Sequence, residues 1–321
     1  MDVFLTAPRG FCAGVVRAVD IVEIALERYE HPVYVKHEIV HNPHVVADLE
    51  SKGAVTVNSV DEIPRGGVVV FSAHGSPPSD YEAAKARGLT VVDATCPLVT
   101  RVHNEAKKYR SEGRRVLLVG HPGHQEVKGT TGQAEMTLLD DREQPELPDW
   151  EPGEPVAVLT QTTLSVDDTA ATIGRITSQY RDVIVRNDIC YATTNRQEAA
   201  KALAAEVQVV LVVGSSTSSN CNRLREVARN AGVPAYLINS PAEIDDAWFE
   251  GVDRVGITSG ASTPEALVQS VCKALNPARV RNIEMAREEV TFTLPDGMRD
   301  AVPPRQSSAW ATEASAAPDA K

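Results

Sequence analysis

The sequence predicts an α/β fold with small, mainly parallel sheets, and three observations support it. Short apolar runs rich in Val, Leu and Ile alternate with amphipathic stretches of ten or more residues. The apolar runs lack period-two alternation, which is typical of parallel strands buried on both faces. Three cysteines recur at spacings of 84 and 94 residues, which indicates that one structural unit is repeated.

The predicted elements alternate along the chain. The strands are expected at residues 33–35, 68–71, 116–119, 156–159, 209–213 and 255–257. The helices are expected at residues 15–29, 100–111, 168–180, 196–206 and 221–231. Pro97 suits a first helical turn, and Thr194 with Gln197 matches a capping box.

The cysteine spacing divides the chain into three pseudo-equivalent α/β units. We expect these units at residues 1–95, 96–189 and 190–280, each with one cysteine of the series. A C-terminal segment, residues 281–300, is expected to pack on the core. Residues 301–321 consist mostly of Ala, Pro and Ser, which predicts a disordered tail.

Cys12, Cys96 and Cys190 share one local context, because each ends an irregular or strand-like segment and precedes a predicted helix. A thiolate at a helix N-terminus is electrostatically favoured, which suits a metal ligand. Three such ligands are compatible with a Cys₃His zinc site or with an iron–sulfur cluster that leaves one iron open. Short C-x₂₋₄-C pairs are absent, and ligands so far apart favour a cluster. Cys221 and Cys272 lie inside helical patterns and are expected to be small buried hydrophobes.

Polar loops follow all six predicted strands, at residues 36–42, 72–76, 120–126, 160–165, 214–220 and 258–262. Ligands of open parallel sheets bind beyond the carboxyl ends of the strands. These loops contain His41, His74 and His124 among hydroxyl, amide and glycine residues, a combination that suits a phosphate or diphosphate. Glu126 is a candidate proton donor, and Thr162 lies in a TQTT run at a strand end.

Composition excludes several partners. The chain has 321 residues with 44 acidic and 32 basic side chains, a formal charge of −12. This balance argues against nucleic acid or an anionic membrane as the main partner. No apolar run approaches the roughly 20 residues of a membrane-spanning helix. The N-terminus does not resemble a signal peptide, and five scattered cysteines make a disulfide framework improbable, so we expect a cytoplasmic protein.

At these residues the chain resembles the LytB/IspH-type family of 4-hydroxy-3-methylbut-2-enyl diphosphate reductases. The resemblance covers about the first 295 residues and rests on motifs that occur in order along the chain: PRGFCAGV, EIVHNPHVV, SAHG, DATCPLVTRVH, GHPGHQEVKGT, TQTTLSVDDT, DICYATTNRQ, VVGSSTSSNCNRL and GITSGAS. Two positions depart from the usual family pattern. Gln125 stands where proline is usual, and Cys221 where serine is common.

The resemblance implies three similar α/β units around a central [4Fe-4S] cluster, held by Cys12, Cys96 and Cys190 with an open fourth iron. The substrate's diphosphate would be bound by His41, His74, His124, Ser218, Ser219, Asn220 and Ser262. Glu126 would supply a proton and Thr162 would help to relay it. Ferredoxin or flavodoxin would deliver electrons, and the products would be isopentenyl and dimethylallyl diphosphate.

Two other functions compete with an iron–sulfur reductase of isoprenoid biosynthesis. One is a zinc-dependent hydrolase that uses some of the same histidines and cysteines. The other is a non-catalytic iron–sulfur sensor of isoprenoid diphosphates. A catalytic role for Glu126 separates the enzyme from the sensor.

Overall fold

The computed structural model describes residues 1–30, 32–142 and 145–298, so the tail predicted for residues 301–321 lies outside the described residues. The described chain divides into two compact units. We call Met1–Cys12 with Asn195–Glu289 the terminal unit, and Ala13–Thr194 with Val290–Met298 the middle unit. The middle unit contains two parallel sheets and the terminal unit contains one.

The first sheet of the middle unit has the strand order β3-β2-β4-β5, with parallel pairing throughout. Its strands are β2 (Val33–Lys36), β3 (Ala54–Val57), β4 (Val68–Phe71) and β5 (Thr90–Asp93). The helices of this part are α1 (Ala13–Arg28), α2 (Pro43–Ser51) and α3 (Pro78–Ala86), with a 3₁₀ turn at Val60–Glu62. Valines dominate the two central strands, β2 and β4, because both faces of these strands are covered.

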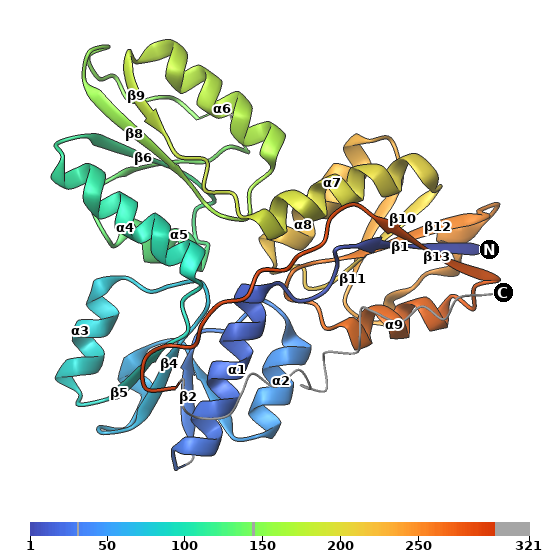
Figure 1. Cartoon of the computed structure of the whole chain (residues 1–321), viewed down its shortest axis with the longest axis horizontal. Coiled ribbons are helices and arrows are strands. Elements are labelled where there is room, and N and C mark those ends of the chain that lie inside the picture. The colour runs from blue at the N-terminus through green and yellow to red at the C-terminus, as the bar shows by residue number, and fades with distance from the viewer. Residues whose placement is uncertain (31, 143–144, 299–321) are drawn as a thin grey trace. The chain divides into compact units, whose positions relative to one another are not determined.

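The second sheet of the middle unit has the order β7-β6-β8-β9 and is also parallel. Its strands are β6 (Arg115–Val119), β7 (Thr137–Leu139), β8 (Pro155–Thr160) and β9 (Asp182–Val185). The accompanying helices are α4 (Pro97–Ser111), α5 (Gln125–Thr131) and α6 (Val166–Gln179) (Figure 1). Two apolar clusters, one containing Leu118 and Leu159 and the other Leu117 and Val158, form its core.

The third sheet belongs to the terminal unit and has the order β11-β10-β12-β1-β13. Its strands are β1 (Asp2–Ala7), β10 (Val209–Val213), β11 (Ala235–Ile238), β12 (Arg254–Ser259) and β13 (Arg279–Glu284). Helices α8 (Ser219–Asn230) and α9 (Glu265–Ala274) belong to this unit, and α7 (Tyr191–Glu206) enters it at Asn195. Two 3₁₀ turns, Pro241–Glu243 and Asp246–Phe249, precede β12.

One strand order is repeated in all three sheets of the described chain, which confirms the predicted fold class. When the strands of a repeat are numbered along the chain, their order across the sheet is second, first, third, fourth. In the third sheet, β1 occupies the fourth position, beside β12. Residues Asp2–Ala7, which the cysteine spacing placed in the first unit, therefore lie in the sheet of the third. In every repeat the fourth strand leads to one cysteine and then to a helix: β5 to Cys96, β9 to Cys190 and β1 to Cys12. The exact boundaries of the three units stay a prediction.

The predicted strands and helices are all present, with small differences at their ends. Pro97 lies in the first turn of α4, as expected. The predicted capping box at Thr194 is wrong, because α7 begins at Tyr191. The amide of Thr194 donates to the carbonyl of Cys190 at 3.0 Å, which places Thr194 inside the first turns.

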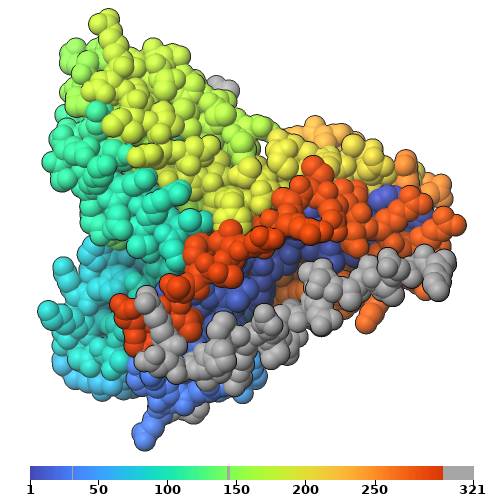
Figure 2. Space-filling model, in the orientation of Figure 1, coloured from blue at the N-terminus to red at the C-terminus, as the bar shows by residue number. Residues whose placement is uncertain are grey.

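The last described segment, Val290–Met298, lies along α1 in the middle unit (Figures 1 and 2). Arg17 donates through Nε to the carbonyl of Thr293 at 2.8 Å, and Arg28 donates to the carbonyl of Gly297. Met298 is buried. None of the described helices has the length and apolar character that a membrane span requires.

Candidate functional site

The central strands of each sheet create the positions at which the predicted site residues lie. In each sheet the second strand lies on one side of the first strand and the third strand lies on its other side. The chain therefore leaves the first and the third strand in opposite directions. The crevice beyond the carboxyl ends of these two strands is where open α/β sheets bind ligands. His41 and His74 follow β2 and β4, and Glu126 and Thr162 follow β6 and β8. In the terminal unit, Ser218–Asn220 and Ser262 follow β10 and β12.

Three histidine rings meet in the middle unit. The rings of His41 and His74 stack with their centroids 4.1 Å apart, and the ring of His124 lies 5.4 Å from His41 and 6.0 Å from His74. Their contacts differ: His41 Nδ1 lies 3.0 Å from an oxygen of Glu38, and His74 Nδ1 lies 3.3 Å from Ser72 Oγ. The structure therefore brings together three candidates that are widely separated in the sequence.

Burial keeps two of these imidazoles neutral at physiological pH. Burial, with the neighbouring His41 and His124, holds the pKa of His74 well below its usual range. Burial also lowers the pKa of His124 to about 3, and His41 and His121 act in the same direction. A bound anion would offset the cost of protonating these rings, so the cluster is suited to a multiply charged ligand.

Glu126 lies in the first turn of α5, two residues after His124 of this cluster. His124 is the N-cap residue of the helix, and its Nδ1 accepts the Glu126 amide at 3.2 Å. The Glu126 side chain is 4 % exposed and accepts two hydrogen bonds from Thr162, from the amide at 2.6 Å and from the hydroxyl at 2.9 Å. Burial raises its pKa to about 7, the bonds from Thr162 oppose this, and Asp188 adds to it. Glu126 can therefore hold or release a proton near neutral pH.

Two of the candidate cysteines are tied by their backbone to the segments that carry these residues. The amide of Cys190 donates to the carbonyl of Thr162 at 3.0 Å, and the amide of Cys96 donates to the carbonyl of Ala73, next to His74, at 3.0 Å. Neither residue is part of a disulfide, and both are partly exposed. Each lies directly before a helix, where a thiolate ligand is favoured.

The sequence interpretation missed Asp188, although it lies in the motif that contains Cys190. This carboxyl group is 2 % exposed, and its Oδ1 accepts from Arg101 at 3.2 Å. The Asp188 amide donates to Thr160 Oγ1 at 2.8 Å. Burial and the nearby Glu105 raise the pKa of Asp188 to about 6, against the effect of Arg101. The sequence alone does not show that Asp188 is a buried acid close to Glu126, because this position depends on the pairing of β8 with β9.

In the terminal unit the hydroxyl-rich loop forms the start of α8. Ser218 is the N-cap residue and accepts the amide of Cys221 at 3.4 Å, and Ser219 and Asn220 occupy the first turn. Asn220 is 4 % exposed, and neither of its side-chain polar atoms has a hydrogen-bond partner among the described residues. Such a buried amide at a helix N-terminus is suited to an anionic ligand.

The other two cysteines of the chain are poor ligand candidates. Burial raises the pKa of both the Cys221 and the Cys272 thiol, which disfavours the thiolate that a metal requires. The sulfur of Cys221 is fully buried and packs against Gly214 and Gly260. Both cysteines therefore fit the expected packing role, and Cys12, Cys96 and Cys190 remain as the partly exposed thiols.

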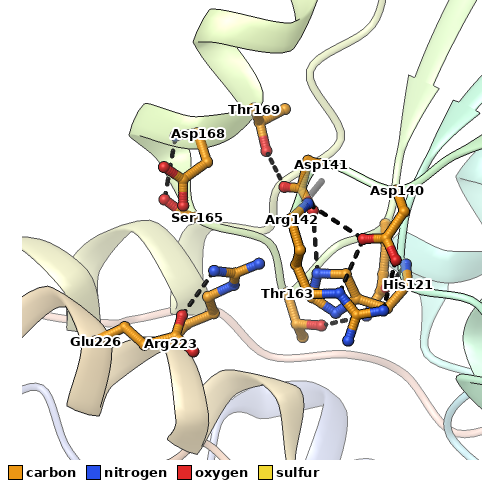
Figure 3. Close-up of polar contacts among 11 residues, drawn as sticks. His121, Asp140, Asp141, Arg142, Thr163, Ser165, Asp168, Thr169, Arg223 and Glu226 are labelled. Atoms are coloured by element: carbon orange, nitrogen blue, oxygen red, sulfur yellow. Dashed lines mark hydrogen bonds and ion pairs between the residues drawn. The ribbon is translucent and has the colours of Figure 1, made fainter. Parts of the chain in front are cut away.

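A second polar cluster, beside β6 and β7, has a structural role. His121 Nε2 lies 3.0 Å from Asp141, and Arg142 binds both oxygens of Asp140 (Figure 3). The ligand atoms of His121, Asp140 and Asp141 lie within 4.8 Å of one another, a spacing that a cation would accept. Because the Arg142 guanidinium already neutralises Asp140, we interpret the cluster as an ion-pair network. It links these loops to Thr169 of α6, at 3.5 Å from Asp141.

Comparison with known proteins agrees with this arrangement. The sequence matches the family described as LytB protein over residues 3–276. It is 50 % identical over 306 residues to the 4-hydroxy-3-methylbut-2-enyl diphosphate reductase of Zymomonas mobilis, covering 93 % of this chain and 90 % of that protein. It is 52 % identical over 305 residues to the Bordetella pertussis protein of the same name, covering 92 % and 94 %.

Solved structures give the same result. The E-1-hydroxy-2-methyl-but-2-enyl-4-diphosphate reductase from Plasmodium falciparum superposes with a TM-score of 0.88 at 34 % identity, over 93 % of this chain and 96 % of that one. A second structure, of the reductase described as the terminal enzyme of the non-mevalonate pathway, gives a TM-score of 0.61 at 33 % identity, over 86 % and 99 %. A family match over most of the chain, together with relatives near 50 % identity, shows that this chain belongs to the LytB family.

Proposed function

We propose that this chain is an iron–sulfur oxidoreductase that converts (E)-4-hydroxy-3-methylbut-2-enyl diphosphate to isopentenyl and dimethylallyl diphosphate, the last step of the non-mevalonate pathway. The observation that carries the proposal is the buried Glu126 carboxyl, bonded to Thr162 and adjoining the cluster of His41, His74 and His124. A proton donor beside a site for a diphosphate is what reductive loss of a hydroxyl group requires.

The relatives favour reduction over the competing functions. They are named as reductases of a diphosphate, which supports neither a zinc-dependent hydrolase nor a non-catalytic sensor. The reaction consumes two electrons and two protons, breaks one C–O bond and releases water. The chain must therefore bind the diphosphate, deliver protons at the reacting carbon and oxygen, and hold an electron-transfer group.

Membership of the LytB family implies a metal-cluster cofactor, and the donor set of the chain fits one. Cys12, Cys96 and Cys190 are not part of a disulfide, are partly exposed and are equivalent in position, each after the fourth strand of a repeat. We propose that these three thiolates hold a [4Fe-4S] cluster with an open fourth iron. When bound, such a cluster supplies electrons one at a time and Lewis-acid activation of the leaving hydroxyl group.

The histidine cluster has the task of binding the diphosphate. His41, His74 and His124 present imidazole donors, and we assign the same role to four residues of the terminal unit, Ser218, Ser219, Asn220 and Ser262. The buried side-chain amide of Asn220, which has no hydrogen-bond partner within the described part of the chain, supports its inclusion. Binding energy from the diphosphate, which does not react, would position the reacting carbon.

Glu126 has the task of supplying a proton. With a pKa of about 7 it is partly protonated at physiological pH, and its bond to the Thr162 hydroxyl provides a path for the proton toward the substrate. Thr162 holds the carboxyl group in one orientation through two donors, so that the proton leaves from a fixed atom.

Ferredoxin or flavodoxin is the electron donor that we propose, with the cytoplasm as the compartment. The function itself is tested without either protein. Anaerobically reconstituted enzyme is given the substrate and a chemical one-electron donor, and the two products are measured. We expect turnover in the wild type, a large loss in Glu126→Gln with its cluster retained, and wild-type turnover in Glu135→Gln. Glu135 is an exposed glutamate of the middle unit that pairs with Arg110. Equal turnover in the two variants would contradict the role of Glu126.

A further inference from the structure

The loop that carries Cys12 is hydrogen-bonded through two of its backbone amides to other residues of the terminal unit. The Gly10 amide donates to Ser259 Oγ at 2.8 Å, and the Cys12 amide donates to the carbonyl of Ala261 at 3.1 Å. Gly10 has a φ of +71°, in the left-handed region that favours glycine. These contacts anchor the loop to the end of β12 and to the residues that follow it.

A third contact comes from a fully buried arginine on α7. Arg196 is 0 % exposed, and its Nη2 donates to the carbonyl of Gly10 at 2.9 Å. The same guanidinium binds both carboxylate oxygens of Glu288, at 2.8 Å through Nη1 and at 3.2 Å through Nη2. Asn195 Nδ2 donates to Glu288 as well, at 3.2 Å. The charge of Arg196 is therefore neutralised by a carboxylate that is itself fixed.

The shape of the guanidinium explains why this position holds arginine. Its planar, rigid fork binds a carboxylate on one edge and still presents a donor to the Gly10 carbonyl. A lysine has a single ammonium group on a flexible stem and cannot hold both partners in the same geometry. The loop, α7 and the segment that contains Glu288 are thus joined through one side chain.

We propose that Arg196 is the positioning residue for Cys12. By fixing the Gly10 carbonyl two residues before the thiol, it keeps the Cys12 side chain in one place in the metal-free chain, ready for the cluster. Ligands that are held in place before binding lose less freedom when the group binds, and the residues that orient them affect its retention. This role rests on the proposed function, in which Cys12 is a cluster ligand.

The test uses the full-length, metal-free chain and measures the reactivity of each thiol. Wild type and Arg196→Gln react with an alkylating reagent, and mass spectrometry gives the rate at each cysteine. We expect Cys12 to react roughly fivefold faster or more in the variant, because its loop opens locally. Cys96 and Cys190 should keep their wild-type rates, and the buried Cys221 should stay protected because the terminal unit remains folded.

Matched variants separate positioning from general loosening. Arg229→Gln removes another arginine-to-carbonyl bond of the terminal unit, from Nε to Ala235 at 3.0 Å, and should leave the Cys12 rate unchanged. Arg196→Lys should give an intermediate rate. Glu288→Gln weakens the interaction that fixes Arg196 without removing it, so the Cys12 rate should rise less than in Arg196→Gln. This variant tests the proposal if Arg196→Gln fails to fold.

Two results would overturn the proposal. One is an unchanged Cys12 rate in the folded Arg196 and Glu288 variants, and the other is an equal rise at Cys12 and Cys221. A further measurement, iron loss to a chelator from the anaerobically reconstituted protein, should be faster in Arg196→Gln than in Arg229→Gln. If the wild type binds no iron, the proposed function fails. The thiol rates still test Arg196 independently.

Discussion

The carboxylate of Glu126 accepts both hydrogen bonds that Thr162 can donate, from its amide at 2.6 Å and from its hydroxyl at 2.9 Å. The two residues are 36 positions apart and meet because β6 and β8, the strands that precede them, are neighbours in the sheet. Two predictions depend on this pair.

Thr162→Val removes the hydroxyl bond and keeps the amide bond. We expect kcat to fall roughly 10- to 100-fold, because the proton path is lost and the carboxyl group is held less firmly. Loss of a bond to the ionised carboxylate also raises the pKa of Glu126, so the decline of kcat at alkaline pH should begin at a higher pH. A pH–rate profile measures both effects. Thr162→Ser should restore the wild-type profile, and a profile that does not shift in the valine variant would argue against the role of this bond.

Glu126→Gln should change how stability depends on pH. The folded-state pKa of about 7 lies above the ordinary value of 4.5, so the unfolded chain ionises first as the pH rises. Ionisation therefore destabilises the fold increasingly between about pH 4.5 and 7, by about 3 kcal/mol in all. The variant lacks this penalty, so its stability relative to the wild type should increase from pH 5 to pH 8. Chemical unfolding of the metal-free chain at several pH values measures it, and a constant difference would contradict the raised pKa.

His124→Asn tests diphosphate binding without damaging α5, because asparagine also caps helices well. We expect KM for the substrate to rise roughly 10- to 100-fold, the effect of losing one charge-assisted hydrogen bond. Since the free imidazole is neutral and the bound anion favours its protonation, the wild type should take up protons when it binds diphosphate near pH 7. Calorimetry in buffers of different ionisation enthalpy measures this uptake, which should shrink in the variant. His44→Asn, in the first turn of α2, should leave KM unchanged.

Cys96→Ser and Cys221→Ser should separate a ligand from a packing residue. The first replaces a partly exposed thiol at the start of α4, and iron and acid-labile sulfide should fall well below the wild-type content after anaerobic reconstitution. The second replaces a buried thiol of raised pKa, and its metal content should match the wild type. Full iron content in Cys96→Ser would remove this residue from the ligand set.

Gly129→Ala and Gly174→Ala compare two glycines inside helices. A Cβ on Gly129 would lie 2.9 Å from the carbonyl oxygen of Gly75, so α5 must shift, and we expect a loss of about 1–3 kcal/mol in unfolding free energy. A Cβ on Gly174 meets nothing within 4 Å, and alanine there should stabilise α6 by about 0.5–1 kcal/mol. Urea unfolding gives both values. The same sign for the two changes would show that the approach of α5 to Gly75 is not tight.

The strands that could be predicted from the sequence are those with apolar residues on both faces. All five residues of β10 are buried, and its run of valines and leucine is unmistakable. The interior strand β1 was missed although four of its six residues are buried. Edge strands such as β5 and β13 were missed because they are mixed in polarity and largely exposed: β5 has one buried residue and β13 has none. Their strand conformation comes from pairing with a neighbour, which a local pattern does not contain.

The loops that contain the site residues could be predicted from the sequence, but the contacts between those residues could not. Polar residues after buried strands indicated His41, His74 and His124, and the structure joins them. Neither the bond between Glu126 and Thr162 nor the burial of Asp188 follows from local sequence, because both depend on strand order. The ligand and substrate roles of these residues stay proposals with the tests given above.

The place of β1 in the third sheet has a consequence for how the chain is made. Both sheets of the middle unit consist of residues between Val33 and Val185, so they can form while synthesis continues. The apolar strand β1 leaves the ribosome first, yet its partners β12 and β13 are made about 250 residues later. Until then β1 is an unpaired apolar strand, which is prone to aggregation or to binding by a chaperone. A chain that stops before β12 therefore leaves β1 without the neighbours it pairs with.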